Sequence, residues 1–236
     1  MAGESRNQRV EAVDKAIKIL GVFNNGDPPL ELSELARRTG FHKSTLLRML
    51  KSLEEGGLVN RLPDKTYGIG SMAVRLASIY QRMYRLEQHV RPVLRRLVIE
   101  TGESASFYRR EGEQRLCLVR ENSQHALREH VLEGEARPLS KGASAQVLLK
   151  FADVRAPHIP HKLAGAIPFF SFEEFNKGIS GAAVPVFGAT GKLEGALTLT
   201  GPLTRLTEDR LKHLSRLLID AGNEVSLALG AQIAVE

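Results

Sequence analysis

This 236-residue chain has a single cysteine, and it lacks long apolar runs and an apolar leader. Cys117 is the only cysteine, which excludes an internal disulfide framework and a thiolate metal cage. No run of roughly 18 uninterrupted apolar residues is present, so no transmembrane helix is expected. The start, MAGESRNQR, lacks the apolar stretch of a signal peptide. We therefore expect a soluble protein in a reducing cytoplasm, without a membrane partner, metal or cofactor.

Charge is distributed unevenly along the chain. Residues 1–85 hold 14 Lys and Arg against 9 Asp and Glu, whereas residues 86–236 hold 19 against 18. Most of the formal net charge of +6 therefore lies in the first third, as expected where phosphate groups are contacted. A basic solvated surface is the simpler interpretation of the charge alone, so a motif has to decide. With 42% hydrophobic residues, the chain is long enough for two domain cores.

Three short helices are predicted in the first third. Apolar residues three and four apart predict a helix over 10–24, which the turn-forming residues 24–29 end. A second helix is expected over 31–40, because Gly40 can take a positive φ and end it. A third helix is expected over 42–55. Its buried stripe is formed by Leu46, Met49, Leu50 and Leu53.

The outward face of the third helix is polar and basic. Hydroxyls and cations near the N-terminal end of a helix suit its entry into the major groove of DNA. Arg48 can form two hydrogen bonds with a guanine edge, or bind a phosphate. Ser44 or Thr45 can bond phosphates or bases, or instead only cap the helix. The predicted DNA contacts on this helix are Lys43, Ser44, Thr45, Arg48 and Lys51.

A basic hairpin follows this helix. The segments 58–62 and 66–69 alternate in strand fashion around Pro63-Asp-Lys65, which predicts two strands and a short turn. Lys65 lies in that turn with Arg61 nearby, and both are expected to contact the DNA backbone or minor groove. A helix-turn-helix followed by a basic hairpin is typical of a winged helix. The first third therefore predicts binding to double-stranded DNA.

The remaining two thirds predict an α+β domain. A long helical stretch over 72–101 is expected to break at Pro92. Apolar residues in its first part, 72–86, can meet either the chain's own core or a partner subunit. Strands with helices on one side are typical of an antiparallel α+β domain. The expected strands are 105–109, 115–120, 178–187 and 193–200, and the expected helices are 143–149 and 206–230.

Almost end to end, the chain resembles the IclR family of bacterial transcriptional regulators. The first third carries LELSELARRTGFHKSTLLRMLKSLEEGGLVNRLPDKTYGIG. The second half carries ARPLSKGASAQVLL and EEFNKGISGAAVPVFGATGKLEGALTLTGPLTRLTEDRL, in which the Gly201-Pro202-Leu-Thr-Arg205 stretch is among the more specific pieces. The resemblance implies a winged helix-turn-helix over 1–70, a linker helix over 71–86 and a GAF/profilin-like effector-binding domain over 87–236.

The resemblance also implies a small-molecule effector, a carboxylate or an aromatic compound, in the third of these segments. Ala143 and Ser144 match backbone N–H groups that meet a ligand carboxylate at a helix start, where unpaired donors face the anion. Thr198 and Thr200 match two strand serines whose hydroxyls reach the ligand. As β-branched residues, the two threonines can equally be plain strand formers.

Two further positions depart from the family pattern. Ser171 falls where a family member has a pocket Asp, and Gly181 falls where many members have a Cys. Both changes remove polar groups, so we expect a ligand larger or less polar than glyoxylate. Between 149 and 178 the chain is shorter than is usual, because part of the domain is trimmed or because a loop is missing from the sequence.

Catalytic and metal sites are not indicated. No phosphate-binding Gly-Lys-Ser/Thr loop, dinucleotide fingerprint or His-Glu-Xaa-Xaa-His occurs, and Cys117 in an alternating pattern is typical of a small buried residue. His158 and His161 are separated by Pro160 without a third ligand, which favours a surface loop over a metal site.

These features predict a ligand-responsive transcriptional regulator. We expect a repressor of a catabolic or metabolic operon that binds a palindromic operator as a homodimer or homotetramer. An architectural DNA-binding protein without an effector is the first alternative, and an enzyme is the second.

Overall fold

The computed structural model describes residues 10–23, 27–84, 86–154, 158–159 and 168–233. Contacts between residues divide the chain into two compact units, Met1–Met83 and Tyr84–Glu236. Among the helices of the described residues, none combines the length and the apolar character needed to cross a bilayer.

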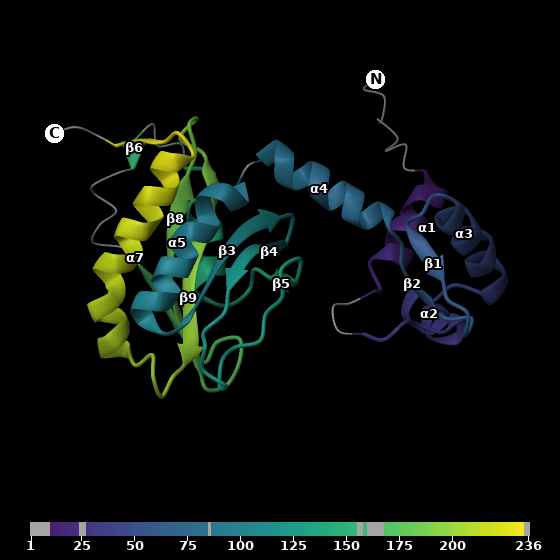
Figure 1. Cartoon of the computed structure of the whole chain (residues 1–236), viewed down its shortest axis with the longest axis horizontal. Coiled ribbons are helices and arrows are strands. Elements are labelled where there is room, and N and C mark those ends of the chain that lie inside the picture. Colours follow the sequence, from purple (N-terminus) through teal and green to yellow (C-terminus); the bar gives the residue numbers. More distant parts are fainter. Residues whose placement is uncertain (1–9, 24–26, 85, 155–157, 160–167, 234–236) are drawn as a thin grey trace, which may run out of the picture. The chain divides into compact units, whose positions relative to one another are not determined.

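The first unit is a winged helix-turn-helix, as predicted (Figure 1). Its helices are α1 (Glu11–Leu20), α2 (Leu32–Thr39) and α3 (Lys43–Glu55). The antiparallel wing consists of β1 (Val59–Arg61) and β2 (Tyr67–Ile69). The core holds Ile19, Leu30, Leu35, Leu46, Leu50, Leu53, Val59 and Tyr67.

The turn between α2 and α3 depends on a glycine. Gly40 has φ 73°, a left-handed conformation that a residue with a side chain rarely adopts, and its N–H donates to the Ala36 carbonyl. The expected helix over 10–24 is shorter in the structure and ends at Leu20. Its apolar face is wider than this small unit can cover, so Val13 and Ile17 are exposed whereas Ile19 is buried.

The helical stretch after the wing does not break at Pro92, contrary to the prediction. It divides into α4 (Met72–Tyr84) and α5 (Leu86–Thr101), with residue 85 outside the described residues. Pro92 lies inside α5, where it removes one N–H donor. The buried side chains of Val90 and Val93 on either side hold both parts of α5 against the core, which offsets that loss.

The second unit contains a six-stranded antiparallel sheet with the strand order β5-β4-β3-β9-β8-β7. The short strands β5 and β7, and a separate two-residue parallel pair, were not expected from the sequence. The sheet strands are β3 (Ser104–Glu111), β4 (Gln114–Glu121), β5 (Ala136–Pro138), β7 (Phe169–Phe172), β8 (Ile179–Phe187) and β9 (Leu193–Pro202). The separate pair is β6 (His158–Ile159) with β10 (Gln232–Ile233).

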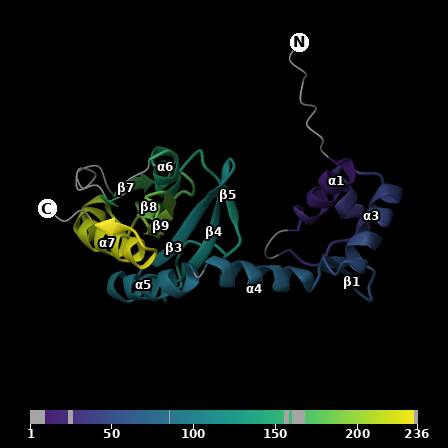
Figure 2. The same cartoon turned by 90° about the horizontal axis from the view of Figure 1, so that it is seen from above.

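Helices cover both faces of this sheet, so the expectation of helices on one side was wrong. Helices α5 and α7 (Glu208–Ala228) lie on one face, and α6 (Ala143–Lys150) lies on the other (Figure 2). The reason is the alternation along β8, which is apolar on both sides. Ala182 and Val184 pack with α5 and α7, whereas Ala183 and Phe187 pack with α6.

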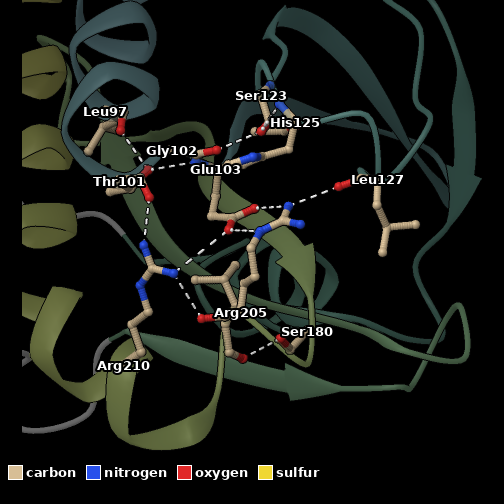
Figure 3. A network of polar contacts seen from close by, with 12 residues as sticks. Leu97, Thr101, Gly102, Glu103, Ser123, His125, Leu127, Ser180, Arg205 and Arg210 are labelled. Atoms are coloured by element: carbon tan, nitrogen blue, oxygen red, sulfur yellow. Dashed lines mark hydrogen bonds and ion pairs between the residues drawn. The ribbon is translucent and has the colours of Figure 1, made fainter.

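A buried ion pair joins the start of β3 to the segment after β9 (Figure 3). Glu103 is fully buried and accepts hydrogen bonds from Nε and Nη2 of Arg205 at 2.7 and 2.9 Å. A Cβ on Gly201 would collide with the Glu103 carboxylate, so the glycine leaves room for it. The Gly201–Arg205 stretch singled out in the sequence therefore has a structural role in this unit.

Candidate functional site

Helix α3 presents one polar face to solvent. Lys43, Ser44, Arg48 and Lys51 are exposed, and Thr45 is half-buried. The residue that precedes the helix is His42, and no side chain caps the N-terminal N–H groups. Ser44 and Thr45 therefore do not cap α3, and their hydroxyls are available for other partners.

Sequence reasoning missed one residue of this face. Leu47 is 46% exposed. At 100° per residue it lies between Lys43 and Lys51 around the helix. An exposed apolar side chain at such a position can contact the methyl group of a thymine. Leu47 lies outside the apolar stripe at 46, 49, 50 and 53, so the helical period gave it no role.

The cations of α3 differ from those of α2 in their partners. On α2, Arg37 and Arg38 both donate to Glu34, and these hydrogen bonds lower the pKa of that carboxyl group to about 2. In the part of the chain that the structure describes, the lysines and arginines of α3 and the wing form no ion pairs. The positive charge available to an anionic partner is therefore concentrated on α3 and the wing. These unpaired cations are Lys43, Arg48, Lys51, Arg61 and Lys65.

The wing turn is held by side-chain hydrogen bonds. Asp64 accepts from the N–H and the Oγ1 of Thr66 at 3.0 and 2.6 Å, which lowers the pKa of the Asp64 carboxyl group. Lys65 has φ 70° at the tip and is exposed. The Arg61 guanidinium lies 5.8 Å from the centre of the Tyr67 ring. Both cations are thus fixed at the backbone while their charges stay in solvent.

The predicted contacts lie on two flanks of α3. Lys43, Arg61 and Lys65 line one surface hollow between α3 and the wing. Thr45 and Arg48 line a second hollow, on the side of α1. Ser44 and Lys51 belong to neither hollow. A rod-shaped polyanion can meet this arrangement along the helix, with cations on both sides of the contact.

The second unit holds a cavity of about 40 Å³. All six residues that the resemblance assigned to an effector line it, although they come from different elements of the chain. The sequence-predicted lining residues are Ala143, Ser144, Ser171, Gly181, Thr198 and Thr200.

Strand register explains why four of these residues meet. Ser171 on β7 pairs with Gly181 on β8, and Gly181 pairs with Thr200 on β9. Thr198 lies two residues before Thr200 on β9 and therefore on the same face of the sheet. A Cβ on Gly181 would lie 2.9 Å from the Leu199 carbonyl, so a cysteine at this position would require β9 to shift. The Oγ1 atoms of Thr198 and Thr200 are buried and have no hydrogen-bond partner among the described residues.

The cavity also has charged walls that sequence reasoning did not find. These residues lie on strands and loops whose folding against α6 leaves no periodic pattern in the sequence. The lining is therefore more polar than the changes at Ser171 and Gly181 indicate. The charged residues among those missed are Arg115, Glu129, Arg137 and Glu174, and the others are Tyr108, Gly142, Phe175, Asn176, Ile179 and Ser180.

Buried ionisable groups are concentrated at this wall. The Arg137 guanidinium donates to Glu129 and Glu135, each at 2.7 Å. Burial lowers the pKa of Arg115, whose hydrogen bonds go to backbone carbonyls. Burial also raises the pKa of the Tyr108 phenol. Such perturbed groups beside a cavity are typical of binding sites.

The structure offers no metal site within the residues it describes, because no three His, Cys, Asp or Glu side chains converge there. Of the two histidines considered in the sequence, His161 lies outside the described residues. The histidine pair therefore stays an interpretation of the sequence alone.

Cys117 is expected to resist alkylation in the folded protein. It is fully buried, and burial raises the pKa of its thiol to about 12, so little thiolate forms at neutral pH. Iodoacetamide at pH 8 should leave the native chain unmodified and label it once in urea, as counted by mass spectrometry. Rapid labelling of the native chain would contradict this placement and indicate an accessible, reactive thiol.

Comparison with known proteins agrees with this architecture. A model of the IclR helix-turn-helix domain matches residues 12–63, and a model of the bacterial transcriptional regulator IclR C-terminal region matches residues 169–227. The transcriptional repressor IclR of Escherichia coli (strain K12) is 23% identical, with 94% of this chain and 91% of that protein covered.

Solved structures give the same result. The crystal structure of an IclR transcriptional regulator from Silicibacter sp. TM1040 superposes with a TM-score of 0.79 at 25% identity, covering 94% of this chain and 98% of that one. A homologue from Microbacterium hydrocarbonoxydans, crystallised with 4-hydroxybenzoate, has a TM-score of 0.74 at 18% identity over 94% of this chain and all of that one. From the two matched models and these relatives, the chain belongs to the IclR family of transcriptional regulators.

Proposed function

We propose that this regulator binds a palindromic operator and is controlled by a small organic or aromatic acid in the cavity of its second unit. The observation that carries the proposal is that one chain has both features: cations without ion-pair partners on α3 and the wing of the first unit, and a polar cavity in the second unit. We assign DNA binding to residues 1–70, linkage to 71–86 and effector binding to 87–236. We further propose that it acts in the cytoplasm as the repressor of a catabolic or metabolic operon.

Exposed apolar residues on α1 and α4 support a symmetric assembly of this regulator on a palindromic operator. Val74, Leu76 and Ile79 on α4 are exposed, as are Val13 and Ile17 on α1. Monomeric proteins rarely leave such apolar rows uncovered, and two-fold association places two recognition helices on a palindrome. We propose a homodimer or a homotetramer on these grounds.

Control by the effector follows from thermodynamic linkage. A ligand changes operator affinity only by the ratio of its affinities for the DNA-competent and the DNA-incompetent arrangements. One solved homologue was crystallised with 4-hydroxybenzoate, which supports an acidic ligand.

A mobility-shift assay on the intergenic DNA upstream of the gene tests the proposal. A band that one carboxylate or aromatic acid removes would support a ligand-controlled repressor. A shift that no compound alters would favour an architectural DNA-binding protein. DNA binding would be contradicted if no shift occurred at physiological salt, either on this DNA or on duplexes selected from a random-sequence pool.

Arg48→Ala is expected to weaken operator binding by about 1–3 kcal/mol if Arg48 contacts a base edge. Binding to unrelated DNA should fall less, because only the specific contact is lost. Arg37→Ala is the matched control, since Arg37 is an exposed arginine already paired with Glu34. Fluorescence anisotropy with operator and scrambled duplexes measures both. An unchanged operator affinity would remove Arg48 from the base-reading residues.

A further inference from the structure

One apolar side chain lies on the outward face of the helix that is expected to enter the DNA groove. Every residue of α3 is described, and Leu47 is the only large apolar side chain of this helix that is exposed. Single exposed apolar residues are common on protein surfaces, so exposure alone indicates no function. A side chain on a helix points toward the N-terminus, so Leu47 covers the turn that holds Lys43 and Ser44. That turn is the part of a recognition helix that meets base edges.

Three cations share a surface hollow with this leucine. Leu47 lines the hollow between α3 and the wing together with Lys43, Arg61 and Lys65. All three cations are exposed, so their charges can reach phosphate groups outside the hollow. Phosphate contacts position a protein on the duplex without reading its sequence. With the DNA backbone held from α3 and from the wing, the leucine that shares their hollow is left for the bases.

Two carboxylates in the same hollow disfavour a phosphate inside it. Glu31 and Asp64 also line the hollow. The Glu31 carboxylate accepts a hydrogen bond from the Ser33 hydroxyl at 3.1 Å. Hydrogen bonds from Thr66 lower the pKa of the Asp64 carboxyl group, so Asp64 is charged at neutral pH. Both carboxylates repel a phosphate but not an uncharged base edge. The space beside Leu47 therefore suits a base.

Base chemistry limits which base a leucine can select. In the major groove, guanine, cytosine and adenine present hydrogen-bonding groups, whereas thymine adds a methyl group on C5. A leucine side chain donates and accepts no hydrogen bonds, so a polar base group that it covers loses water without a new partner. A methyl group gains from the same contact, because apolar surface leaves water on both sides.

We propose that Leu47 is a specificity-determining residue that contacts the C5 methyl group of one thymine in each half of the operator. The contact makes the regulator prefer a T·A pair to a C·G pair at that position, in addition to the base edge that Arg48 reads. This inference rests on the proposed function, because it names a base that the DNA-binding unit recognises.

Uracil substitution tests the methyl contact without changing the protein. The full chain first selects its own duplex from a random-sequence pool, and each thymine of that duplex is then replaced by uracil, which lacks only the methyl group. Fluorescence anisotropy at one salt concentration measures the affinities. One thymine in each half-site should lose about 4-fold in affinity, the effect of one methyl group removed from an apolar contact. Replacing both should cost about 15-fold, because distant sites add.

Methylated cytosine provides the converse test. A C·G pair at the same position should bind more weakly, and 5-methylcytosine in that pair should recover about 4-fold, because the methyl group returns. A duplex in which neither removal nor restoration of a methyl group changes the affinity would overturn the proposal.

Leu47→Ala connects the methyl group with the residue. This variant should reduce the uracil effect from about 4-fold to less than about 1.5-fold, because the partner of the methyl group is gone. Alanine favours the helical conformation, so circular dichroism should be unchanged. Leu227→Ala is the matched control: Leu227 is 45% exposed on α7 of the second unit, against 46% for Leu47, and its replacement should keep the full uracil effect. An equal uracil effect in Leu47→Ala and the unsubstituted chain would assign the thymine to another residue and overturn the proposal.

Salt dependence separates Leu47 from the cation beside it. Lys43→Ala should reduce the slope of log affinity against log salt by about 0.9 per bound subunit and leave the uracil effect at about 4-fold. Leu47→Ala should do the reverse, because an apolar contact releases no counterions. A slope lowered equally in both variants would show that Leu47 acts through phosphate contacts, which would refute the assignment.

The selection step separates this inference from the proposed function. Failure to select any duplex at physiological salt would contradict DNA binding, and the thymine contact with it. A selected duplex whose affinity is indifferent to every methyl group would refute the role of Leu47 and keep the DNA-binding regulator.

Discussion

Arg205→Ala is expected to lower the free energy of unfolding of the second unit by about 3 kcal/mol, because it leaves Glu103 buried without its bidentate partner. The cost lies at the lower end for a broken buried pair, since Nη1 of Arg210 remains 3.8 Å from the same carboxylate (Figure 3). Urea unfolding of the full chain, followed by circular dichroism, measures the loss. A two-transition fit is needed if the two units unfold separately.

Two controls identify the charge as the cause. Arg216→Ala breaks an exposed ion pair with Asp220 on α7 and should cost less than about 0.5 kcal/mol. Adding Glu103→Gln to Arg205→Ala removes the uncompensated charge and should recover part of the stability. A loss below about 1 kcal/mol in Arg205→Ala would show that water or other groups satisfy Glu103 without Arg205.

Local signals explain what the sequence predicted well. The turn at Gly40, the stripe on α3 and the wing around Lys65 each depend on residues within a few positions of one another. Helix and strand periods also located β3, β4, β8 and β9 to within a few residues. Such features can be read because neighbours along the chain are neighbours in the structure.

Long-range packing explains the elements that the sequence predicted wrongly or did not predict. Pro92 is tolerated because α5 is held by its buried face, and α6 covers the second face of a sheet whose two-sided burial no single strand reveals. Short strands such as β5 and β7 carry too few residues for a period to be visible.

The residues that line the cavity also divide into those that the sequence located and those that it did not. The resemblance located Ala143 and Thr198, but the charged wall formed by Arg115 and Glu129 was not found. Which charged side chains line a cavity depends on the three-dimensional positions of residues that are far apart in the sequence. Composition and spacing carry no information on that point.

The wing lysine should control salt dependence without controlling sequence preference. Because α3 and the wing present unpaired cations, operator affinity should fall by about 10³- to 10⁵-fold between 50 and 200 mM salt if a bound dimer neutralises six to ten phosphates. Lys65→Asn should reduce the slope of log affinity against log salt by about 0.9 per bound subunit. Asparagine suits the test because it tolerates the left-handed conformation, φ 70°, that Lys65 adopts.

The affinity lost in Lys65→Asn should be the same for operator and scrambled duplexes, since a phosphate contact carries no sequence information. Lys192→Asn removes the same charge from an exposed position in the second unit and should leave the slope unchanged. Anisotropy titrations at four salt concentrations give both slopes. A loss confined to the operator would place Lys65 against a base edge in the minor groove, and α3 would then not be the only element of the first unit that reads sequence.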